Sequence, residues 1–413
     1  MKILLFVSDL AVGGAQTVLG RLASGWIEQG FEVTVLTTHA LPDESPIPEG
    51  ARRIRLDVLT LAEHLAAYRR ASRVYDEANR PDQLDDAFCD TPAFAHAVRE
   101  LRRKIRSEAP AVVISFGGTA NLMLGVARPE LGRDILCIAR EGNDPYRHPF
   151  RHMFTGLRRF IFGRVETAVC NTRSAAHYVR GLALGCNVHF IANPVPPCVL
   201  TGARTSAPTI LCVARLIPQK DHATLLHAFA DARLEGWRLA VVGGGELEKA
   251  LYGLAENLGI SNRVDWHGHQ GEPARFYPSS QIIVLASRFE GMPNALIEGM
   301  RAGLAPVATR CSAGIAELIS DGENGLTVPV GDAAALADSL ASLVQDARLR
   351  KRLGRAARAS TVFFDPSRVL AQWDQVLGST HRRRGRNWTD GQASGPEGEV
   401  RAGEGRRPGA FRS

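Results

Sequence analysis

The chain lacks the features that mark disulfide scaffolds, zinc sites and membrane proteins. Its seven cysteines are scattered and form no C-x-x-C pair, which argues against a disulfide framework and against a zinc site. We therefore expect reduced thiols in a cytoplasmic protein. No stretch approaches the roughly 18 uninterrupted apolar residues of a membrane helix, and the apolar run at 3–7 is too short for the core of a signal peptide.

A strong charge of either sign is also missing. The 50 lysines and arginines exceed the 43 aspartates and glutamates only slightly, and no segment has the cation density of a dedicated nucleic-acid binder. With 45% hydrophobic and 23% charged residues, the composition is ordinary for a globular enzyme. A length of 413 residues exceeds what one hydrophobic core usually serves, so the sequence predicts two domains.

Short apolar runs alternate with amphipathic stretches, which is typical of parallel sheets flanked by helices. In the first half we expect strands near 2–7, 32–38, 52–56, 111–116, 134–139, 166–170 and 188–191, with helices at 14–29, 93–108 and 173–183. In the second half we expect strands near 209–214, 238–242, 262–267, 281–286, 304–309 and 325–328, with helices at 220–234, 246–257, 294–302, 332–344 and 346–360. The predicted fold is α/β, with two doubly wound Rossmann-like domains facing each other across a cleft.

A proline-rich stretch separates the two halves. Three prolines within 194–197 disfavour helix and central strand, so the predicted linker begins at Asn193. We place the first domain at 1–193 and the second at 194–378, with a last helix that can pack back on the first domain. Residues 379–413 almost lack aliphatic side chains and are expected to form a disordered basic tail, with contact to an anionic surface as the alternative.

Two glycines, Gly13 and Gly14, open the first predicted helix directly after the first strand. They let the backbone approach a ligand closely, and the helix start directs free N–H groups and a positive dipole end toward it. A complete G-x-G-x-x-G is absent, so a dinucleotide site is not predicted. A plain strand-to-helix turn explains these residues equally well.

Two cations lie on the loop after the first strand of the second half. Arg215 and Lys220 follow the strand that ends near Ala214, and ligands of open α/β sheets bind at the carboxyl ends of the strands. A guanidinium fork and a mobile ammonium together suit a diphosphate. The alternative is two solvated surface cations.

The segment from Glu290 to Glu298 is the most specific signal. Pro293 suits the first position of a helix, which leaves Glu290 in the loop and Glu298 inside the helix. The free N–H groups near 292–295 would then face the same crevice as the two cations. Two carboxylates so placed can hold different hydroxyl groups of one elongated ligand, although each glutamate alone would be unremarkable.

Further turns follow neighbouring strands of the second half. Gly244 lies after the strand at 238–242, Gly268 and Gln270 after the strand at 262–267, and Ser312 before a short helix that carries Glu317. Each could be a simple turn, but all of them fall at the same edge of the predicted sheet.

These residues resemble the retaining glycosyltransferases of family 4, which have the two-domain GT-B fold. The similarity rests on Arg215, Lys220, the glycines at 243–245, the E-x₇-E pair and the stretches 300–303 and 323–326, and more loosely on 13–16 and 191–195. The stretches 101–121 and 140–145 are similar to bacterial enzymes that build capsule, O-antigen or lipid-linked oligosaccharides. The resemblance implies an acceptor-side first domain and a second domain that binds the nucleotide-sugar donor.

The resemblance also implies individual roles. Arg215 and Lys220 would clamp the diphosphate, with Gly14 near it. Glu290 would hold a hydroxyl of the donor sugar and Glu298 the ribose hydroxyls. The remaining implied donor contacts are Gly244, Gly268, Gln270, Gly291, Met292, Pro293 and Asn294.

One position departs from the family pattern. Many relatives carry a histidine beside the donor sugar, after the strand that matches 134–139, whereas this chain has Arg140, Glu141, Gly142 and Asn143 there. Whether Glu141 or Asn143 replaces that histidine stays open.

The implied chemistry is retention by front-face attack, in which the leaving phosphate accepts the acceptor proton. UDP is the expected nucleotide, with GDP as the alternative, and the sugar would be a hexose or an N-acetylhexosamine. No D-x-D motif stands at a strand end, so neither a metal nor another cofactor is expected. A nucleotide-sugar epimerase, a phosphorylase with pyridoxal phosphate and a catalytically silent binding protein remain alternatives.

Residues 145–165 contain five arginines and no acidic residue. Phe150, Phe154, Leu157, Phe160 and Ile161 recur at helical spacing, with His152 and the arginines between them. Such a basic amphipathic helix suits an anionic membrane surface or a polyprenyl-diphosphate acceptor. A core helix with a solvated basic face is the alternative.

Overall fold

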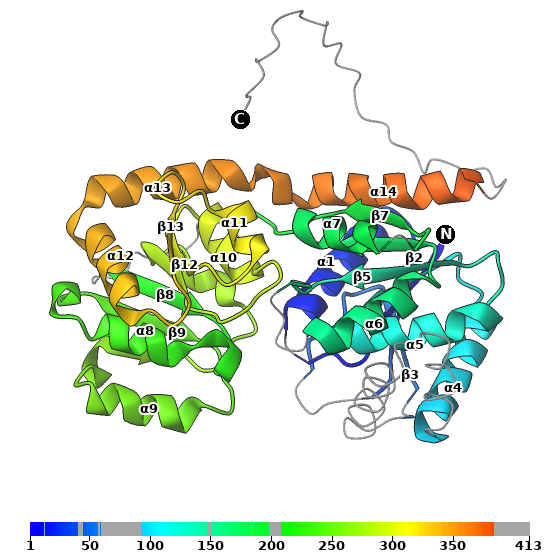
Figure 1. The fold of residues 1–413 in the computed structure, drawn as a ribbon, viewed down its shortest axis with the longest axis horizontal. Helices are drawn as coiled ribbons and strands as arrows, with labels where there is room; N and C mark the ends of the chain where they lie inside the picture. Colours follow the sequence, from blue (N-terminus) through cyan, green and yellow to red (C-terminus); the bar gives the residue numbers. More distant parts are fainter. Residues whose placement is uncertain are drawn as a thin grey trace, which may run out of the picture.

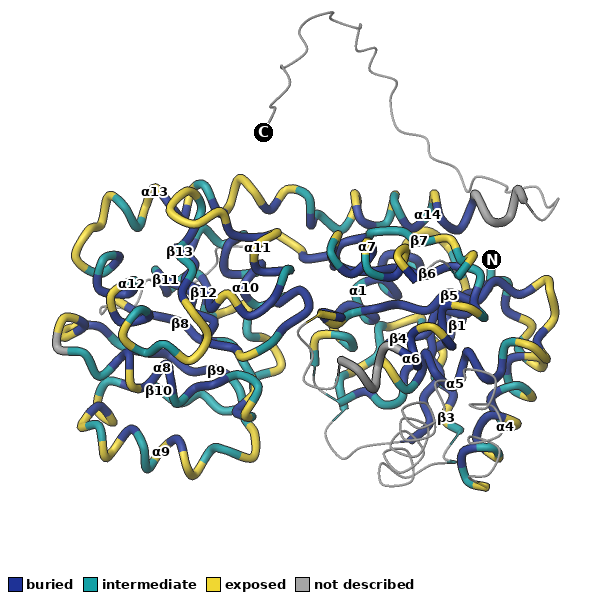
Figure 2. The backbone as a smooth tube through the Cα atoms, in the orientation of Figure 1, coloured by how far each residue is buried: buried dark blue, intermediate teal, exposed yellow. Residues whose placement is uncertain are grey.

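The computed structural model describes residues 1–11, 13–39, 44–56, 58, 92–146, 151–182, 184–197 and 208–383. Within these residues, two parallel sheets form the centres of two α/β domains, which lie side by side (Figure 1). The strands of both sheets are largely buried (Figure 2). Two doubly wound domains of this kind confirm the predicted fold class.

The first sheet has the order β3-β2-β1-β4-β5-β6-β7. Its strands are β1 (Lys2–Val7), β2 (Glu32–Thr37), β3 (Arg52–Arg55), β4 (Val112–Phe116), β5 (Leu136–Glu141), β6 (Thr167–Cys170) and β7 (Asn187–Phe190). Helices α4 (Pro92–Glu108), α5 (Gly118–Ala127), α6 (Arg151–Phe162) and α7 (Arg173–Gly181) pack on one face, and α1 (Gly14–Glu28) packs on the other. Burial on both faces explains why the central strands are continuous apolar runs.

The second sheet has the order β10-β9-β8-β11-β12-β13. Its strands are β8 (Thr209–Val213), β9 (Arg238–Val242), β10 (Val264–Trp266), β11 (Ile282–Leu285), β12 (Ala305–Thr309) and β13 (Leu326–Val328). Helices α8 (His222–Phe229), α9 (Glu248–Asn257) and α12 (Ala333–Gln345) contribute to one core, and α10 (Asn294–Arg301) and α11 (Ala313–Leu318) to the other. The described 3₁₀ turns are η2 (Arg128–Glu130), η3 (Pro218–Lys220), η4 (Ala232–Leu234), η5 (Ser261–Arg263), η6 (Pro273–Phe276) and η7 (Thr361–Phe364).

The last two helices join the domains. Helix α13 (Ala347–Ser360) lies on the second domain, and α14 (Pro366–Arg383) continues along the same side of the molecule onto the first domain (Figure 1). There Trp373 meets Trp26 of α1 edge to face, with ring centroids 5.6 Å apart. Although α14 has 18 residues, none of the helices in the described ranges is long and apolar enough to cross a membrane.

Two expectations about helices are wrong. The single helix expected at 220–234 is divided into η3, α8 and η4. Asp221 separates η3 from α8, because its left-handed backbone angles, φ 48° and ψ 47°, interrupt a right-handed helix. Residues 379–383, expected to be disordered, continue α14, whose preceding Val376 and Leu377 are buried and leave carbonyls for the next N–H groups. The rest of the predicted tail lies outside the described residues.

Candidate active site

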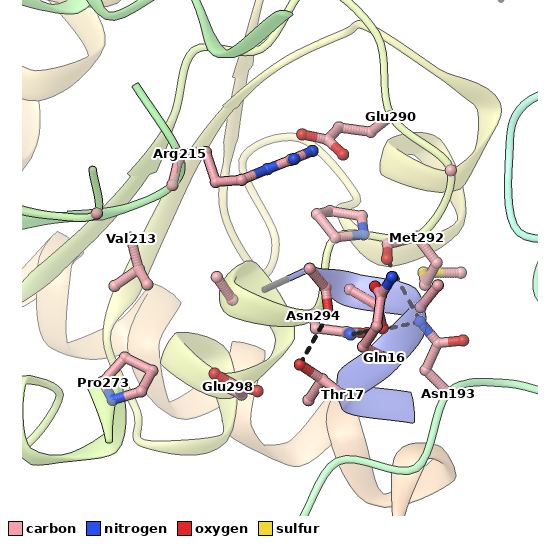
Figure 3. Close-up of a pocket in the computed structure, with 18 of the residues that line it drawn as sticks. Gln16, Thr17, Asn193, Val213, Arg215, Pro273, Glu290, Met292, Asn294 and Glu298 are labelled. Atoms are coloured by element: carbon pink, nitrogen blue, oxygen red, sulfur yellow. Dashed lines mark hydrogen bonds between the residues drawn. The ribbon is translucent and has the colours of Figure 1, made fainter. Parts of the chain in front are cut away.

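A cleft of about 1120 Å³ lies between the two domains. In each sheet the strand order reverses direction at the first strand of the domain, β1 or β8, and ligands of such sheets bind at this switch point. The loops after both strands line the cleft, together with loops that follow their neighbours. Figure 3 shows residues from both domains around this space.

Three predicted charged residues lie together in the cleft. Lys220 donates to Oε1 of Glu290, and the Ser287 hydroxyl donates to the same oxygen over 2.6 Å. The guanidinium of Arg215 extends toward Glu290 (Figure 3), yet Arg215 has no ion pair within the described part of the chain. Glu290 is therefore held in place while Arg215 keeps its charge for a ligand.

The loop before α10 presses against the first domain. Pro293 occupies the N-cap, so the helix begins at Asn294. A Cβ atom on Gly291 would lie 2.0 Å from the carbonyl oxygen of Gly142, a distance that no side chain tolerates. Only glycine allows this approach, which brings Gly291, Met292, Pro293 and Asn294 into the cleft.

Glu298 also lines the cleft, one turn into α10. Its Oε1 accepts a hydrogen bond from Arg21 of the first domain over 2.5 Å, and its Oε2 accepts one from the Tyr277 hydroxyl over 2.6 Å. Arg21 in turn donates to the carbonyl of Pro194 over 3.1 Å. The carboxylate predicted to meet ribose is thus oriented by both domains.

Asparagine side chains connect the two helix starts that face the cleft. Asn193 donates to Oδ1 of Asn294 over 2.5 Å, and Asn294 donates to the carbonyl of Gly14 over 3.2 Å. The starts of α1 and α10 therefore lie close together, and N–H groups at helix starts favour anions. The two cations and two carboxylates predicted to bind the donor, Arg215, Lys220, Glu290 and Glu298, all line this one cleft.

Comparison with known proteins identifies a glycosyltransferase family in each half of the chain. The family described as "Glycosyltransferase Family 4" matches residues 12–197, and "Glycosyl transferases group 1" matches residues 201–360. The lipopolysaccharide core biosynthesis glycosyltransferase LpsE of Rhizobium meliloti is 31% identical over 68% of this chain and 79% of its own length. The chain belongs to the family 4 glycosyltransferases.

Two other similar proteins support this family and its fold. An alpha-1,4-N-acetyl-D-galactosaminyltransferase of Campylobacter jejuni, named for a substrate linked to PP-undecaprenol, is 25% identical over 91% of this chain and 98% of its own. The crystal structure of HepE from Anabaena, in complex with UDP, superposes with a TM-score of 0.70 at 16% identity. It covers 92% of this chain and 100% of its own, and it shows that this glycosyltransferase has the GT-B fold.

Of the three turn residues predicted as donor contacts in the second domain, two line the cleft of the glycosyltransferase and one does not. Gly244 and Gln270 lie on the cleft wall. Gly268 lies behind the wall, where its carbonyl accepts a hydrogen bond from the Gly243 N–H over 2.8 Å. The prediction of Gly268 as a direct contact is therefore not supported, because its backbone completes the turn.

Of the two candidates for the missing histidine, only one lines the cleft. Strand β5 runs two residues further than expected and ends at Glu141. The Glu141 carboxylate turns away from the cleft, accepting from Arg158 over 2.6 Å and from the Asn143 N–H over 3.0 Å. Asn143 lines the cleft and Glu141 does not, so Glu141 holds the loop rather than a ligand.

The basic helix predicted at 145–165 forms as α6 over a shorter range. Leu157, Phe160 and Ile161 are buried as expected, whereas Arg158 is buried too, because it pairs with Glu141. The expected basic face therefore loses Arg158. Residues 147–150 and the side chains of 151–155, which include Phe150, His152 and Phe154, lie outside the described parts.

Sequence reasoning missed several polar residues that join the domains. Asp144 of the first domain accepts from the Ala313 N–H at the start of α11, over 3.0 Å. Glu317 of α11 accepts from the N–H groups of Arg173 and Ser174 at the start of α7, each over 2.9 Å. The available signals were the position of Asp144 after a predicted strand and that of Glu317 on a short helix at the predicted sheet edge, and neither indicated a contact between the domains.

His222 lies directly behind the cation loop, as the first residue of α8. It is 2% exposed, and its Nε2 lies 3.7 Å from the Cys212 sulfur. Burial, and then the nearby charge of Lys220, lower the pKa of His222 to about 4. At neutral pH this side chain therefore adds no charge beside Lys220.

Proposed function

We propose that this glycosyltransferase moves a hexose or an N-acetylhexosamine from a UDP-sugar, with retention, to a glycan or polyprenyl-diphosphate-linked acceptor in cell-surface polysaccharide synthesis. The observation that carries the proposal is the convergence of two cations and two carboxylates on one interdomain cleft. The names of the relatives support the acceptor class, and the UDP bound to HepE supports the nucleotide.

Each cleft residue has a physical role in this proposal. Arg215 and Lys220 bind the diphosphate, and Lys220 can do so while it contacts Glu290 because an ammonium has three donors. Glu290 binds a donor-sugar hydroxyl. Glu298 binds ribose through lone pairs that remain beside its bonds to Arg21 and Tyr277.

The reaction breaks the anomeric C–O bond, and the bonding electrons move onto the departing diphosphate. The acceptor hydroxyl attacks from the same face, and its proton passes to the phosphate oxygen that leaves. Fixed cations and helix N–H groups stabilise the growing negative charge, which is usually the largest contribution to catalysis. We propose that these groups of the chain supply that charge without a metal.

The decisive experiment measures transfer from UDP-sugars by the purified variants Arg215→Ala and Lys220→Ala. We expect kcat to fall about a hundredfold or more in each, because each variant removes one charge stabiliser. Lys351→Ala, an exposed position on α13, is the matched control and should transfer normally. EDTA should leave wild-type transfer intact.

Near-normal turnover in either folded cleft variant would reject the diphosphate clamp. Donor isomerisation without any acceptor would instead indicate the epimerase alternative.

We also propose that residues 145–165 bring the enzyme to an anionic membrane surface that holds the lipid-linked acceptor.

A further inference from the structure

Arg140 is a buried cation at the edge of the cleft. It lies near the carboxyl end of β5, is 4% exposed and lines the cleft. Its Nη2 donates to Oδ1 of Asn193, and its guanidinium carbon lies 5.5 Å from the centre of the Phe116 ring. Over the described ranges no carboxylate forms an ion pair with it. Burial lowers the pKa of Arg140 to about 10, so it remains charged at neutral pH.

The other cations of the cleft show why Arg140 stands out. Arg21 is paired with Glu298, and Lys220 is paired with Glu290. Only Arg215 and Arg140 line the cleft without a carboxylate partner within the described residues, one from each domain. A buried guanidinium without an ion-pair partner is costly, and the nearby charge of Glu141 offsets only part of that cost, so an anion in the cleft would be bound strongly by Arg140.

The surroundings of Arg140 indicate where that anion lies. Through Asn193 and Asn294, Arg140 is connected to Gly14, by hydrogen bonds that reach the starts of α10 and α1. Free N–H groups and the positive dipole ends of these helices favour negative charge at the same place. Three independent sources of positive potential therefore surround one part of the cleft.

We propose that Arg140 is a further diphosphate-binding residue, a cation that the first domain supplies opposite Arg215. This inference rests on the proposed function, in which a nucleoside diphosphate occupies the cleft. Guanidinium groups bind phosphate oxygens through short, charge-assisted hydrogen bonds. Because Arg140 and Arg215 belong to different domains, a bound diphosphate also draws the domains together.

Calorimetric titration with UDP and with uridine tests the proposal. In Arg140→Gln, the Kd for UDP should rise about tenfold or more, the usual effect of losing a charge-assisted hydrogen bond, while the Kd for uridine should not change. Arg140→Lys keeps the charge without the fork and should give an intermediate Kd for UDP. Arg99→Gln removes an exposed arginine of the same domain, on α4, and should match the wild type.

The ratio of the Kd for UDP to the Kd for uridine separates direct binding by Arg140 from a merely structural role of Arg140. If Arg140 only holds Asn193 in place, Arg140→Gln would weaken UDP and uridine equally or not at all, and either result would overturn the inference. If Arg140→Gln does not fold, the same ratio measured on Arg140→Lys decides. A wild-type protein that binds no UDP would contradict the proposed function, whereas wild-type binding with unaffected variants contradicts only the role of Arg140.

Discussion

At the scale of single residues, His222 makes the stability of the protein depend on pH. Its pKa is about 4 in the folded protein, below the ordinary value of 6.5. Between these values the unfolded chain binds a proton that the folded protein does not, so stability falls as the pH falls. From His222 alone we expect a loss of about 2 kcal/mol between pH 7.5 and pH 5.

Urea unfolding of wild type and His222→Phe at both pH values measures this contribution. Phenylalanine keeps a buried aromatic ring and cannot titrate, so the variant should lose less stability on acidification than the wild type. His227→Phe, at an exposed position of the same helix, is the control and should behave as the wild type does. An identical pH dependence in His222→Phe would show that the buried imidazole is not the titrating group.

Single residues also show which positions could be predicted from the sequence and which could not. Arg215 and Lys220 were predictable because a strand, a short loop and a helix fix their position at the sheet edge. The direction of the Glu141 side chain was not predictable, because β5 extends two residues further than its apolar run. Side chains alternate between the two faces of a sheet along a strand. That extension turns Arg140 toward the cleft and Glu141 toward Arg158.

At the scale of elements, α6 tests the proposed membrane contact. Arg159 is its exposed arginine among the described side chains, while Arg158 is buried. We expect the wild-type protein to float with vesicles rich in acidic lipid at low salt, and high salt should release it. Arg159→Gln should lower the partition constant for these vesicles about fivefold, from roughly 1 kcal/mol per basic residue near such a surface.

Arg348→Gln, exposed on α13, provides the matched control for flotation and should leave binding unchanged. Failure of the wild type to float at low salt would reject the contact.

The periodicity of 145–165 predicted the apolar side of α6 correctly, since Leu157, Phe160 and Ile161 are buried. It could not predict the partner of Arg158, because Glu141 lies on another element and only the fold brings the two together.

At the scale of the whole molecule, backbone contacts, the Arg21–Glu298 pair and two further carboxylates hold the domains together. A Cβ atom on Gly314 would lie 2.0 Å from the Gly291 carbonyl oxygen, so the second-domain loop packs closely on both of its sides. Asp144 reaches from the first domain to the start of α11, and Glu317 reaches back to the start of α7. Two domains were predictable from the sequence, but these contacts depend on side chains whose neighbours are set only after both domains have folded.

Asp144 and Glu317 reach across the interface in opposite directions, and we predict that Glu317 controls how far the domains open. A carboxylate at a helix start typically contributes about 1 kcal/mol, and the N–H groups of Arg173 and Ser174 are exposed enough to bind water instead. Glu317→Ala should therefore populate open forms about fivefold more, raising the radius of gyration from small-angle scattering without UDP and leaving the folding of each domain intact. Glu323→Ala removes an exposed charge from the same domain and should scatter as the wild type does. A scattering curve of Glu317→Ala that matches the wild type would mean that the glycine contacts and the Arg21–Glu298 pair suffice to keep the cleft closed.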